Sequence, residues 1–416
     1  MHEVIKLKNG VRIIYEKMPS VRSAAVGIFI GVGSRFESPS ENGCAHFIEH
    51  MLFKSTTEHS AAELAYITDS VGGQINAYTT REQTCFYAKV LDDHLVKAID
   101  LLCEMFFKCA FDEAETESER GVITEEIGMY EDTPDDACYE RLISRCFRGA
   151  LGRPVLGTVR TLKDMTGASL RAYKNSHYTA GNIVISLCGS FEDSHLRLLE
   201  ERFGSLPASP RSKTKKAAYT SHVSLRKKKL EQNQFCLAFP SVSLADDDRF
   251  AMNLLSTALG GGVSSRLFQN IREKHGLCYS IYSFQSGFAD TGLLSVATAV
   301  SKDTEEKALR LIGRELDSLL QDGITDDELD RAREQARSSL LMGLESTSSR
   351  MLRLGNSLMS IDKCIEPDEL LQRYNRITRE DILSLARRYI DFDKLSLSAL
   401  GRTGDGEQYM NALLEH

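Results

Sequence analysis

The feature that most constrains the fold of this chain is an internal duplication. The segment TCFYAKVLDDHLVKAIDLLCEMF (84–106) predicts a strand, an acidic turn and an amphipathic helix, and GLLSVATAVSKDTEEKALRLIGREL (292–316) repeats that order. The match continues in 111–127 and 324–340, which are acidic at their start and each open a long helix. A repeated unit of about 200 residues is longer than a solenoid repeat, so the sequence predicts two homologous domains.

The two domains are expected at 1–208 and 227–416. The segment between them, 209–226, is rich in Pro, Ser and Lys, which is typical of a linker. Within the first half, short alternating strands such as 23–32 and 84–91 mix with helices, and no regular βαβ rhythm joins them. The sequence therefore predicts an α+β fold in which each domain is a mainly antiparallel sheet with helices packed on one face.

Composition narrows the classes of partner. The 51 basic and 59 acidic side chains give a net charge of −8, which disfavours nucleic acid and anionic membranes. The longest apolar run, AAVGIFIGVG (24–33), is far shorter than the roughly 20 residues of a membrane-spanning helix. No signal-peptide pattern opens the sequence. The ten cysteines include no CxxC pair, so we expect buried thiols in a reducing, cytoplasmic compartment.

The stretch GCAHFIEHML (43–52) holds the most informative polar residues. On a helix, His46 and His50 lie about 40° apart, and Glu49 falls within the same sector of about 100°. Their neighbours are apolar, so this polar face lines an interior. On these five residues alone two interpretations stay open: core histidines bonded to backbone carbonyls, and a metal site. We interpret Cys44, two residues before His46, as a core side chain and not as a ligand.

A hydrolytic zinc site needs three protein ligands and one open position. The acidic helix expected at 113–131 offers many carboxylates, most of them on a solvated face. Glu119 and Glu126 flank its apolar stripe about 20° apart, whereas Glu125 points about 100° away from Glu126. This spacing predicts Glu126 as the third ligand and Glu119 as a carboxylate that steadies the site.

Several further segments complete a family pattern. They are GGQINAYTTREQT (72–84), ERGVITEEIGMYEDTPDD (119–136), GRPVLGT (152–158) and GGGVSSRLFQNIREKHGLCYS (260–280). HxxEH followed about 75 residues later by a glutamate is the inverzincin pattern. Over nearly all of its 416 residues the chain resembles the pitrilysin-like (M16) zinc metallopeptidases, in particular short bacterial members related to the mitochondrial processing peptidase β subunit.

The resemblance implies a LuxS/processing-peptidase-like metallohydrolase fold and a set of roles. His46, His50 and Glu126 bind one zinc ion per chain, and Glu49 is the general base. Glu49 takes a proton from a zinc-activated water and passes it to the leaving amine. Glu119, which helical spacing and not the resemblance selects, is counted with the catalytic residues. The implied activity is that of an endopeptidase for short, unstructured peptides held in an enclosed dimer cavity.

The second half lacks this pattern. Ser339 stands where the duplication places Glu126, so we expect no metal site there. Taken alone, Arg272 and Tyr279 read as a surface arginine and a core tyrosine. The resemblance implies instead that they contact substrate and help to stabilise the oxyanion. Because they lie in the second of only two domains, we predict a homodimer whose sites are completed in trans.

One predicted strand and one glycine-rich loop are candidates for ligand binding. GGQINAYTTREQT alternates polar and apolar residues after a Gly-Gly turn, which predicts an exposed edge strand to which an extended peptide can add. The alternative is an ordinary sheet edge; the resemblance assigns Asn76 and Ala77 to substrate binding. GGGVSSR (260–266) lacks the lysine and spacing of a phosphate-binding loop.

Two other functions compete with the peptidase. A non-catalytic structural or partner subunit of the same fold typically loses part of HxxEH or the distal glutamate, and this chain keeps both. A small metal-dependent hydrolase or lyase acting on other substrates shares only the HxxEH element. The complete set favours the zinc endopeptidase.

Overall fold

The computed structural model describes residues 2–415, which form two compact units. Unit 1 comprises the chain as far as Gly128 together with Arg153–Lys215 and Leu341–Cys364. Unit 2 comprises Met129–Gly152, Lys216–Leu340 and the chain from Ile365 onward. Each unit therefore contains a short segment that belongs, by sequence order, to the other half.

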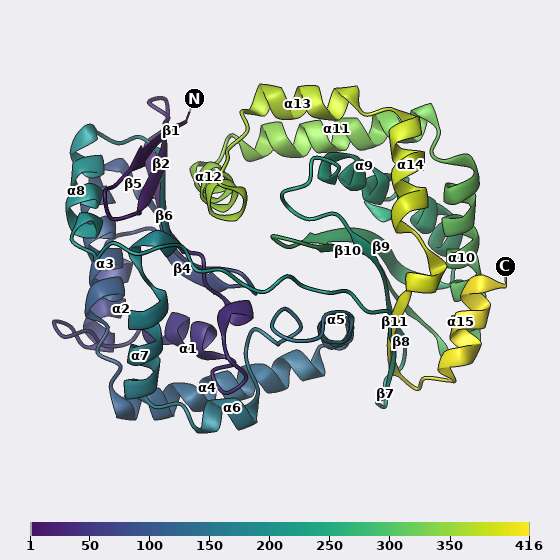
Figure 1. The fold of residues 1–416 in the computed structure, drawn as a ribbon, viewed down its shortest axis with the longest axis horizontal. Coiled ribbons are helices and arrows are strands. Elements are labelled where there is room, and N and C mark those ends of the chain that lie inside the picture. Colours follow the sequence, from purple (N-terminus) through teal and green to yellow (C-terminus); the bar gives the residue numbers. More distant parts are fainter. Residues whose placement is uncertain (1, 416) are drawn as a thin grey trace. The chain divides into compact units, whose positions relative to one another are not determined.

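Unit 1 is built on a six-stranded sheet in the order β1-β2-β6-β3-β5-β4 (Figure 1). Its strands are β1 (Glu3–Lys6), β2 (Arg12–Lys17), β3 (Ser23–Ile30), β4 (Gln74–Thr79), β5 (Thr84–Leu91) and β6 (Ile183–Gly189). Only the β2–β6 pair is parallel. The central strand β3 is buried along nearly its whole length. β4 is an edge strand, as the sequence predicted.

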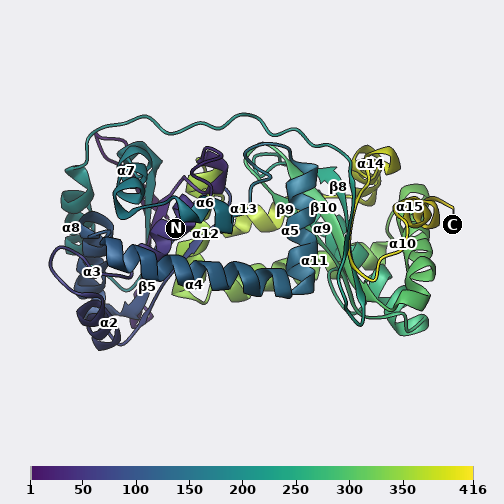
Figure 2. The ribbon, with the colours of Figure 1, turned by 90° about the horizontal axis from the view of Figure 1, so that it is seen from below.

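Most helices of unit 1 pack on one face of this sheet. They are α1 (Cys44–Met51), α2 (Ala61–Ser70), α3 (Leu95–Lys108), α6 (Val159–Lys163), α7 (Gly167–His177) and α8 (Asp193–Gly204), with short 3-10 turns η1 (Ser34–Phe36), η2 (Asp92–His94) and η3 (Ala180–Asn182). Ile28, Phe47, Ile99 and Leu102 belong to the core between these layers. α4 (Glu113–Asp132) is one long helix that begins in unit 1 and ends in unit 2 (Figure 2).

The other face of this sheet is covered by α12 (Thr347–Ile361), which packs on β3 and β6. The approach is close, because a Cβ atom added at Gly27 would lie 2.5 Å from the sulfur of Met351, and one at Gly355 would lie 2.2 Å from the ring of Phe29. The guanidinium of Arg12 pairs with Asp362 just beyond the helix. Glycines at these positions therefore permit the contact between helix and sheet.

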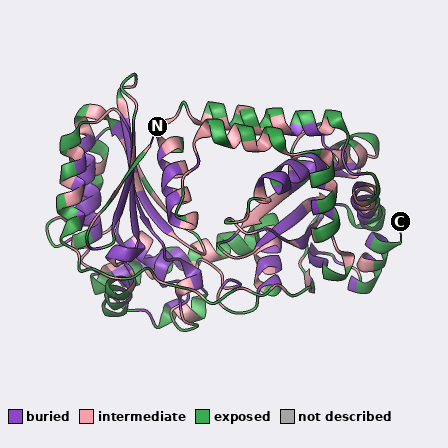
Figure 3. Ribbon diagram, turned by 45° about the horizontal axis from the view of Figure 1, so that its top comes forward, coloured by how far each residue is buried: buried purple, intermediate pink, exposed green. Residues whose placement is uncertain are grey.

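Unit 2 is built on a five-stranded sheet in the order β7-β11-β8-β10-β9. Its strands are β7 (Val223–Lys227), β8 (Asn233–Ser241), β9 (Cys278–Gly287), β10 (Gly292–Val300) and β11 (Ser396–Gly401). Its helices are α5 (Pro134–Cys146), α9 (Arg249–Gly260), α10 (Glu305–Asp322), α13 (Pro367–Arg376), α14 (Arg379–Tyr389) and α15 (Gly406–Leu414), with η5 (Lys302–Thr304), η6 (Phe392–Lys394) and the π-helix η4 (Phe268–Lys274); α11 (Asp326–Gly343) ends in unit 1. The inner strands of both sheets are largely buried, whereas the edge strands β4 and β9 are partly exposed (Figure 3).

The two sheets repeat one topology, because β2-β6-β3-β5-β4 and β7-β11-β8-β10-β9 arise in the same chain order. The predicted α+β class with two mainly antiparallel sheets is confirmed. The sequence did not anticipate the exchange in which α5 packs in unit 2 and α12 in unit 1, since periodicity shows which face of a helix is buried but not against which sheet. The predicted boundaries at 208 and 227 describe consecutive halves and omit this exchange.

The passage from unit 1 to unit 2 at Lys215 falls within the range 209–226, although its last residues already belong to β7. Among residues 2–415 no helix has both the length and the apolar character that crossing a membrane requires.

Candidate metal centre

Helix α1 brings the two motif histidines together on one face. It starts after Gly43, whose φ of +104° lies in the left-handed region that favours glycine, and it packs into the core through Phe47. His46 is buried and His50 half-buried, and their ring centres lie 4.6 Å apart. The four-residue spacing therefore has the geometric consequence that the sequence predicted.

Helix α4 adds the carboxylate of Glu126. Its Oε2 lies 3.6 Å from Nε2 of His46 and 3.4 Å from Nε2 of His50. One ligand atom of each of the three residues lies within 4.8 Å of the others. Zinc bonds of about 2.0–2.1 Å at tetrahedral angles separate neighbouring ligand atoms by about 3.4 Å, so the donor set fits a zinc ion in type and in spacing.

The protonation states of the two imidazoles differ. Burial, together with the neighbouring His50, lowers the pKa of His46 to about 4, so this ring is neutral as a ligand must be. Burial alone would also lower the pKa of His50, but hydrogen bonds to Glu119 and Glu126 raise it to about 9. Because a metal-ligating imidazole nitrogen must be unprotonated, His50 would have to lose its proton for the three residues to hold a metal ion.

Glu119 orients the second histidine. It is buried, and its Oε1 lies 2.8 Å from Nδ1 of His50, so Nε2 is the nitrogen that faces Glu126. Lys54 approaches the other oxygen of Glu119 at 2.5 Å. Sequence reasoning missed Lys54, although it follows His50 by four residues. This carboxylate–histidine pair is the arrangement that fixes ring orientation in metal sites.

Glu49 lies beside this cluster but outside the set of three ligand atoms. Its Oε2 accepts a hydrogen bond of 2.5 Å from Oγ1 of Thr79, the last residue of the edge strand β4. Burial raises the pKa of Glu49, and the bond from Thr79 only partly opposes this. A carboxylate with a raised pKa is suited to accept and return a proton near neutral pH.

Asn76 and Ala77 lie on β4, the same edge strand. Asn76 is exposed and pairs in register with Tyr87, and Ala77 pairs with Phe86. The Ala77 amide donates to the side-chain oxygen of Asn76. The edge strand β4 therefore carries polar groups, and its last residue, Thr79, links the strand to Glu49.

Arg272 and Tyr279 belong to unit 2, and the structure brings them together. The Arg272 guanidinium lies 4.4 Å from the ring centre of Phe268 and 5.1 Å from that of Tyr279. Tyr279 is 78% exposed, so its interpretation as a core tyrosine is wrong. Phe268 and Arg272 both lie on the π-helix η4, a rare element that is frequent at functional sites, and sequence reasoning missed Phe268.

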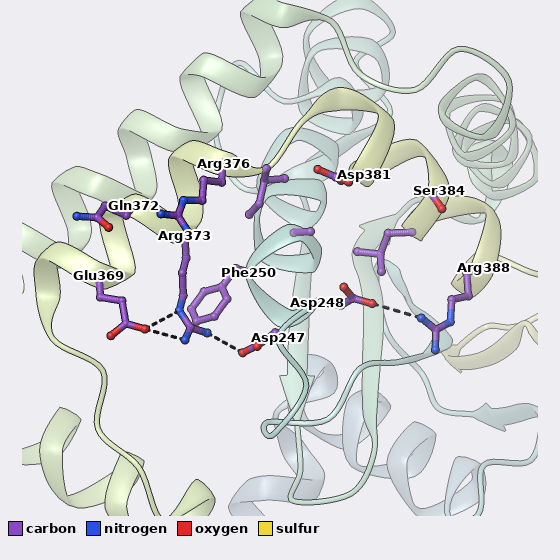
Figure 4. A pocket seen from close by; sticks show the side chains of 13 residues that line it. Asp247, Asp248, Phe250, Glu369, Gln372, Arg373, Arg376, Asp381, Ser384 and Arg388 are labelled. Atoms are coloured by element: carbon purple, nitrogen blue, oxygen red, sulfur yellow. Dashed lines mark hydrogen bonds and ion pairs between the residues drawn. The ribbon is translucent and has the colours of Figure 1, made fainter.

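Other groups of polar side chains give weaker evidence of a functional site. Glu58, His59 and Glu104 also lie close enough to share an ion, but Lys108 pairs with Glu58, and His59 bonds Glu104. In unit 2 a cavity of about 540 Å³ lies along α9, α13 and α14 (Figure 4). Most of its charged side chains are paired with one another: Arg373 joins Asp247 and Glu369, and Arg388 joins Asp248. Cys44 is buried 3.8 Å from the sulfur of Met165, as expected of a core side chain.

Two sequence profiles match most of the chain. The profile of "Insulinase (Peptidase family M16)" matches 12–159, which contains the whole cluster, and that of "Peptidase M16 inactive domain" matches 164–336. The chain belongs to peptidase family M16. Among M16 relatives, the uncharacterized zinc protease YmxG of Bacillus subtilis is 42% identical over 93% of this chain and 95% of its own length. An uncharacterized zinc protease of Streptomyces coelicolor is 40% identical over 96% and 89%.

Solved structures share the M16 fold. The peptidase M16 inactive domain from Pseudomonas fluorescens superposes with a TM-score of 0.90 at 20% identity and covers 97% of this chain and 98% of its own. A protease from Helicobacter pylori gives 0.88 at 21% identity, with 96% and 99% covered. These structures confirm the predicted fold, and the sequence profiles and relatives confirm the predicted family.

Proposed function

We propose that this M16 chain is a zinc-dependent endopeptidase that hydrolyses short, unstructured peptides. The observation that carries the proposal is the convergence of His46, His50 and Glu126 at distances of 3.4 and 3.6 Å, with Glu49 beside them and not among them. The names of the relatives, zinc proteases, agree with it.

In this mechanism His46, His50 and Glu126 would hold one zinc ion per chain, which would supply Lewis acidity and a water molecule of lowered pKa. Glu49 would accept a proton from the attacking water and deliver it to the leaving amine. Thr79 holds Oε2 of Glu49 and so aims the carboxylate. Glu119 keeps Nε2 of His50 directed at the ion.

The substrate is proposed to add to β4 as an extended strand, with Asn76 and Ala77 contacting its backbone. This recognition selects chain conformation more than sequence, which suits short, unstructured peptides. Arg272 and Tyr279 are proposed to donate hydrogen bonds to the oxyanion. We propose that they come from the second subunit of a homodimer with an enclosed cavity, and that neither nucleic acid nor a membrane is a partner. The ten free cysteines agree with a cytoplasmic location.

The test is cleavage of a quenched fluorescent peptide library by the wild type and by Glu49→Gln, with zinc measured on both. The proposal expects about one zinc per chain in both proteins and cleavage only by the wild type. If both hold zinc and neither cuts, the chain is a structural or partner-dependent subunit. Mixing Glu49→Gln with Arg272→Ala subunits tests the dimer, because completion in trans restores activity and a site completed within one subunit does not.

A further inference from the structure

Glu37 has an unusual place at the start of the helix that carries the histidines. It follows η1 and is only 3% exposed. Its Oε2 accepts hydrogen bonds from the Gly43 amide at 2.8 Å and from Nδ2 of Asn42 at 2.9 Å, and its Oε1 accepts one from the Ala45 amide at 2.8 Å. Glu37 thus supplies the acceptor that the N-cap residue Gly43 lacks.

The same residues tie the helix start to the loop at 153–157. Arg153 donates to the backbone carbonyl of Glu37, and Asn42 donates to the carbonyl of Pro154 at 2.9 Å. The fit is tight, since a Cβ atom at Gly157 would lie 2.5 Å from the Asn42 carbonyl oxygen. The first turn of α1 is therefore held from two sides.

Capping a helix with a buried carboxylate costs free energy, because the charged group loses its hydration. Elsewhere in unit 1, α2 and α7 begin with ordinary exposed caps, Ser60 and Thr166. In unit 2 the corresponding helix α9 follows the N-cap residue Asp248, which makes no side-chain capping bond. The buried cap accompanies the helix that carries the histidines, which suggests a purpose beyond helix stability.

We infer that Glu37 is a positioning residue for the metal ligands of the proposed zinc site. It contacts Ala45, the neighbour of His46, and so fixes the rotation and height of α1 relative to Glu126 on α4. The separations of 3.4 and 3.6 Å depend on that placement. Glu37 reaches the chemistry only through α1, and this inference rests on the proposed function.

The test compares Glu37→Gln with Glu16→Gln. A glutamine side chain is nearly isosteric with glutamate, but its amide nitrogen cannot accept from a backbone amide. Glu16 is a matched control: it is another buried glutamate of unit 1, and it pairs with Arg350 on α12, away from α1. Three kinds of measurement are made: hydrogen exchange of 43–53 without zinc, zinc affinity by competition with a chelating dye, and steady-state kinetics that give kcat and KM.

For Glu37→Gln we expect faster exchange of 43–53, zinc affinity weaker by about 10–100-fold, and a loss carried by kcat with KM nearly unchanged. Glu16→Gln leaves all three at wild-type values. Asn42→Ser is a milder variant that removes only the side-chain amide that donates to Glu37 and to the Pro154 carbonyl. It should shift all three measurements in the same direction by smaller amounts.

Equal zinc affinity and kcat for the two glutamine variants overturn the inference, even if exchange increases, because Glu37 is then only a structural cap. Unchanged exchange in zinc-free Glu37→Gln overturns it independently of zinc. A wild type that binds no zinc refutes the proposed function instead, so the two failures are distinguishable.

Discussion

Five strands of unit 1 and the five strands of unit 2 share one order, and the helices α1 and α9 at matching places in that order differ in character. In unit 1, α1 lies in the chain between β3 and β4 and buries or half-buries His46, Glu49 and His50. In unit 2, α9 lies between β8 and β9, and its buried positions include Met252 and Leu255. Since the same topology forms around apolar side chains, the fold does not need the polar cluster. Unit 2 is therefore a control for unit 1 within one chain, and the presence in unit 1 of polar groups that burial penalises supports the proposal that they serve chemistry.

The largest effect is expected from Glu49→Gln, which removes the proton acceptor while keeping the shape of the side chain. We expect kcat/KM to fall by about 10²–10⁴-fold with zinc content unchanged. Glu125→Gln, an exposed position on α4, is the control and keeps wild-type activity. Wild-type turnover by Glu49→Gln would remove the chemical reason for the difference between the units.

A second prediction compares matching positions of α4 and α11. Glu126 of α4 corresponds in the duplication to Ser339 of α11. Glu126→Gln should weaken zinc affinity by more than about 100-fold, because a direct ligand matters more than the carboxylates that support one. Ser339→Ala should leave affinity unchanged. Zinc content and dye competition measure both, and an equal response of the two variants contradicts a site confined to unit 1.

The third prediction concerns pH and the buried cap. Burial raises the pKa of Glu37 to about 7 from 4.5, although bonds from Ala45 and Asn42 and the charge of Arg153 oppose the rise. The folded chain thus holds this proton more tightly than the unfolded chain does. The resulting stability is fully present below about pH 4.5 and is lost as pH rises through about 7.

Compared with Glu37→Gln, the zinc-free wild type should lose about 3 kcal/mol of stability between those pH values. The other ionisable side chains that face Glu37 include Cys44 and Tyr173, whose pKa values burial raises above this window. Denaturant unfolding of both proteins at pH 4.5, 6 and 7.5 gives the difference. A constant difference shows that Glu37 stays ionised throughout, and the cap then resembles an ordinary exposed one.

Local sequence patterns predicted much of this difference between the two units. The strand–turn–helix units at 84–106 and 292–316 announced the duplication, and helical periodicity selected Glu126 and Glu119 from an acidic helix, which the structure places beside His50. The sequence did not predict the contacts between distant segments. The exchange of α5 and α12, and the Glu37 cap, depend on which surfaces meet in three dimensions, and neither propensity nor periodicity encodes that choice.

The fourth prediction tests the exchanged helix of unit 1. Gly355→Ala places a methyl group against the buried Phe29 ring, and such overpacking costs about 1–3 kcal/mol, which exceeds the gain of about 1 kcal/mol in helix propensity. Gly343→Ala on α11 meets nothing within 4 Å, so it should be neutral or slightly stabilising. Denaturant midpoints measure both. A neutral Gly355→Ala would mean that α12 docks loosely.

The smallest effect is expected in unit 2, at the one place where that unit is proposed to assist the chemistry. Phe268 stacks on Arg272, and a cation–π contact contributes about 0.5–1 kcal/mol. Phe268→Leu should therefore lower kcat/KM by about 2–5-fold, while Phe268→Tyr keeps an aromatic face and should remain near the wild type. Arg272→Ala gives the upper limit of the effect. A large loss in Arg272→Ala with none in Phe268→Leu means that the arginine acts without the stack, and no loss in either variant confines the catalytic machinery to unit 1.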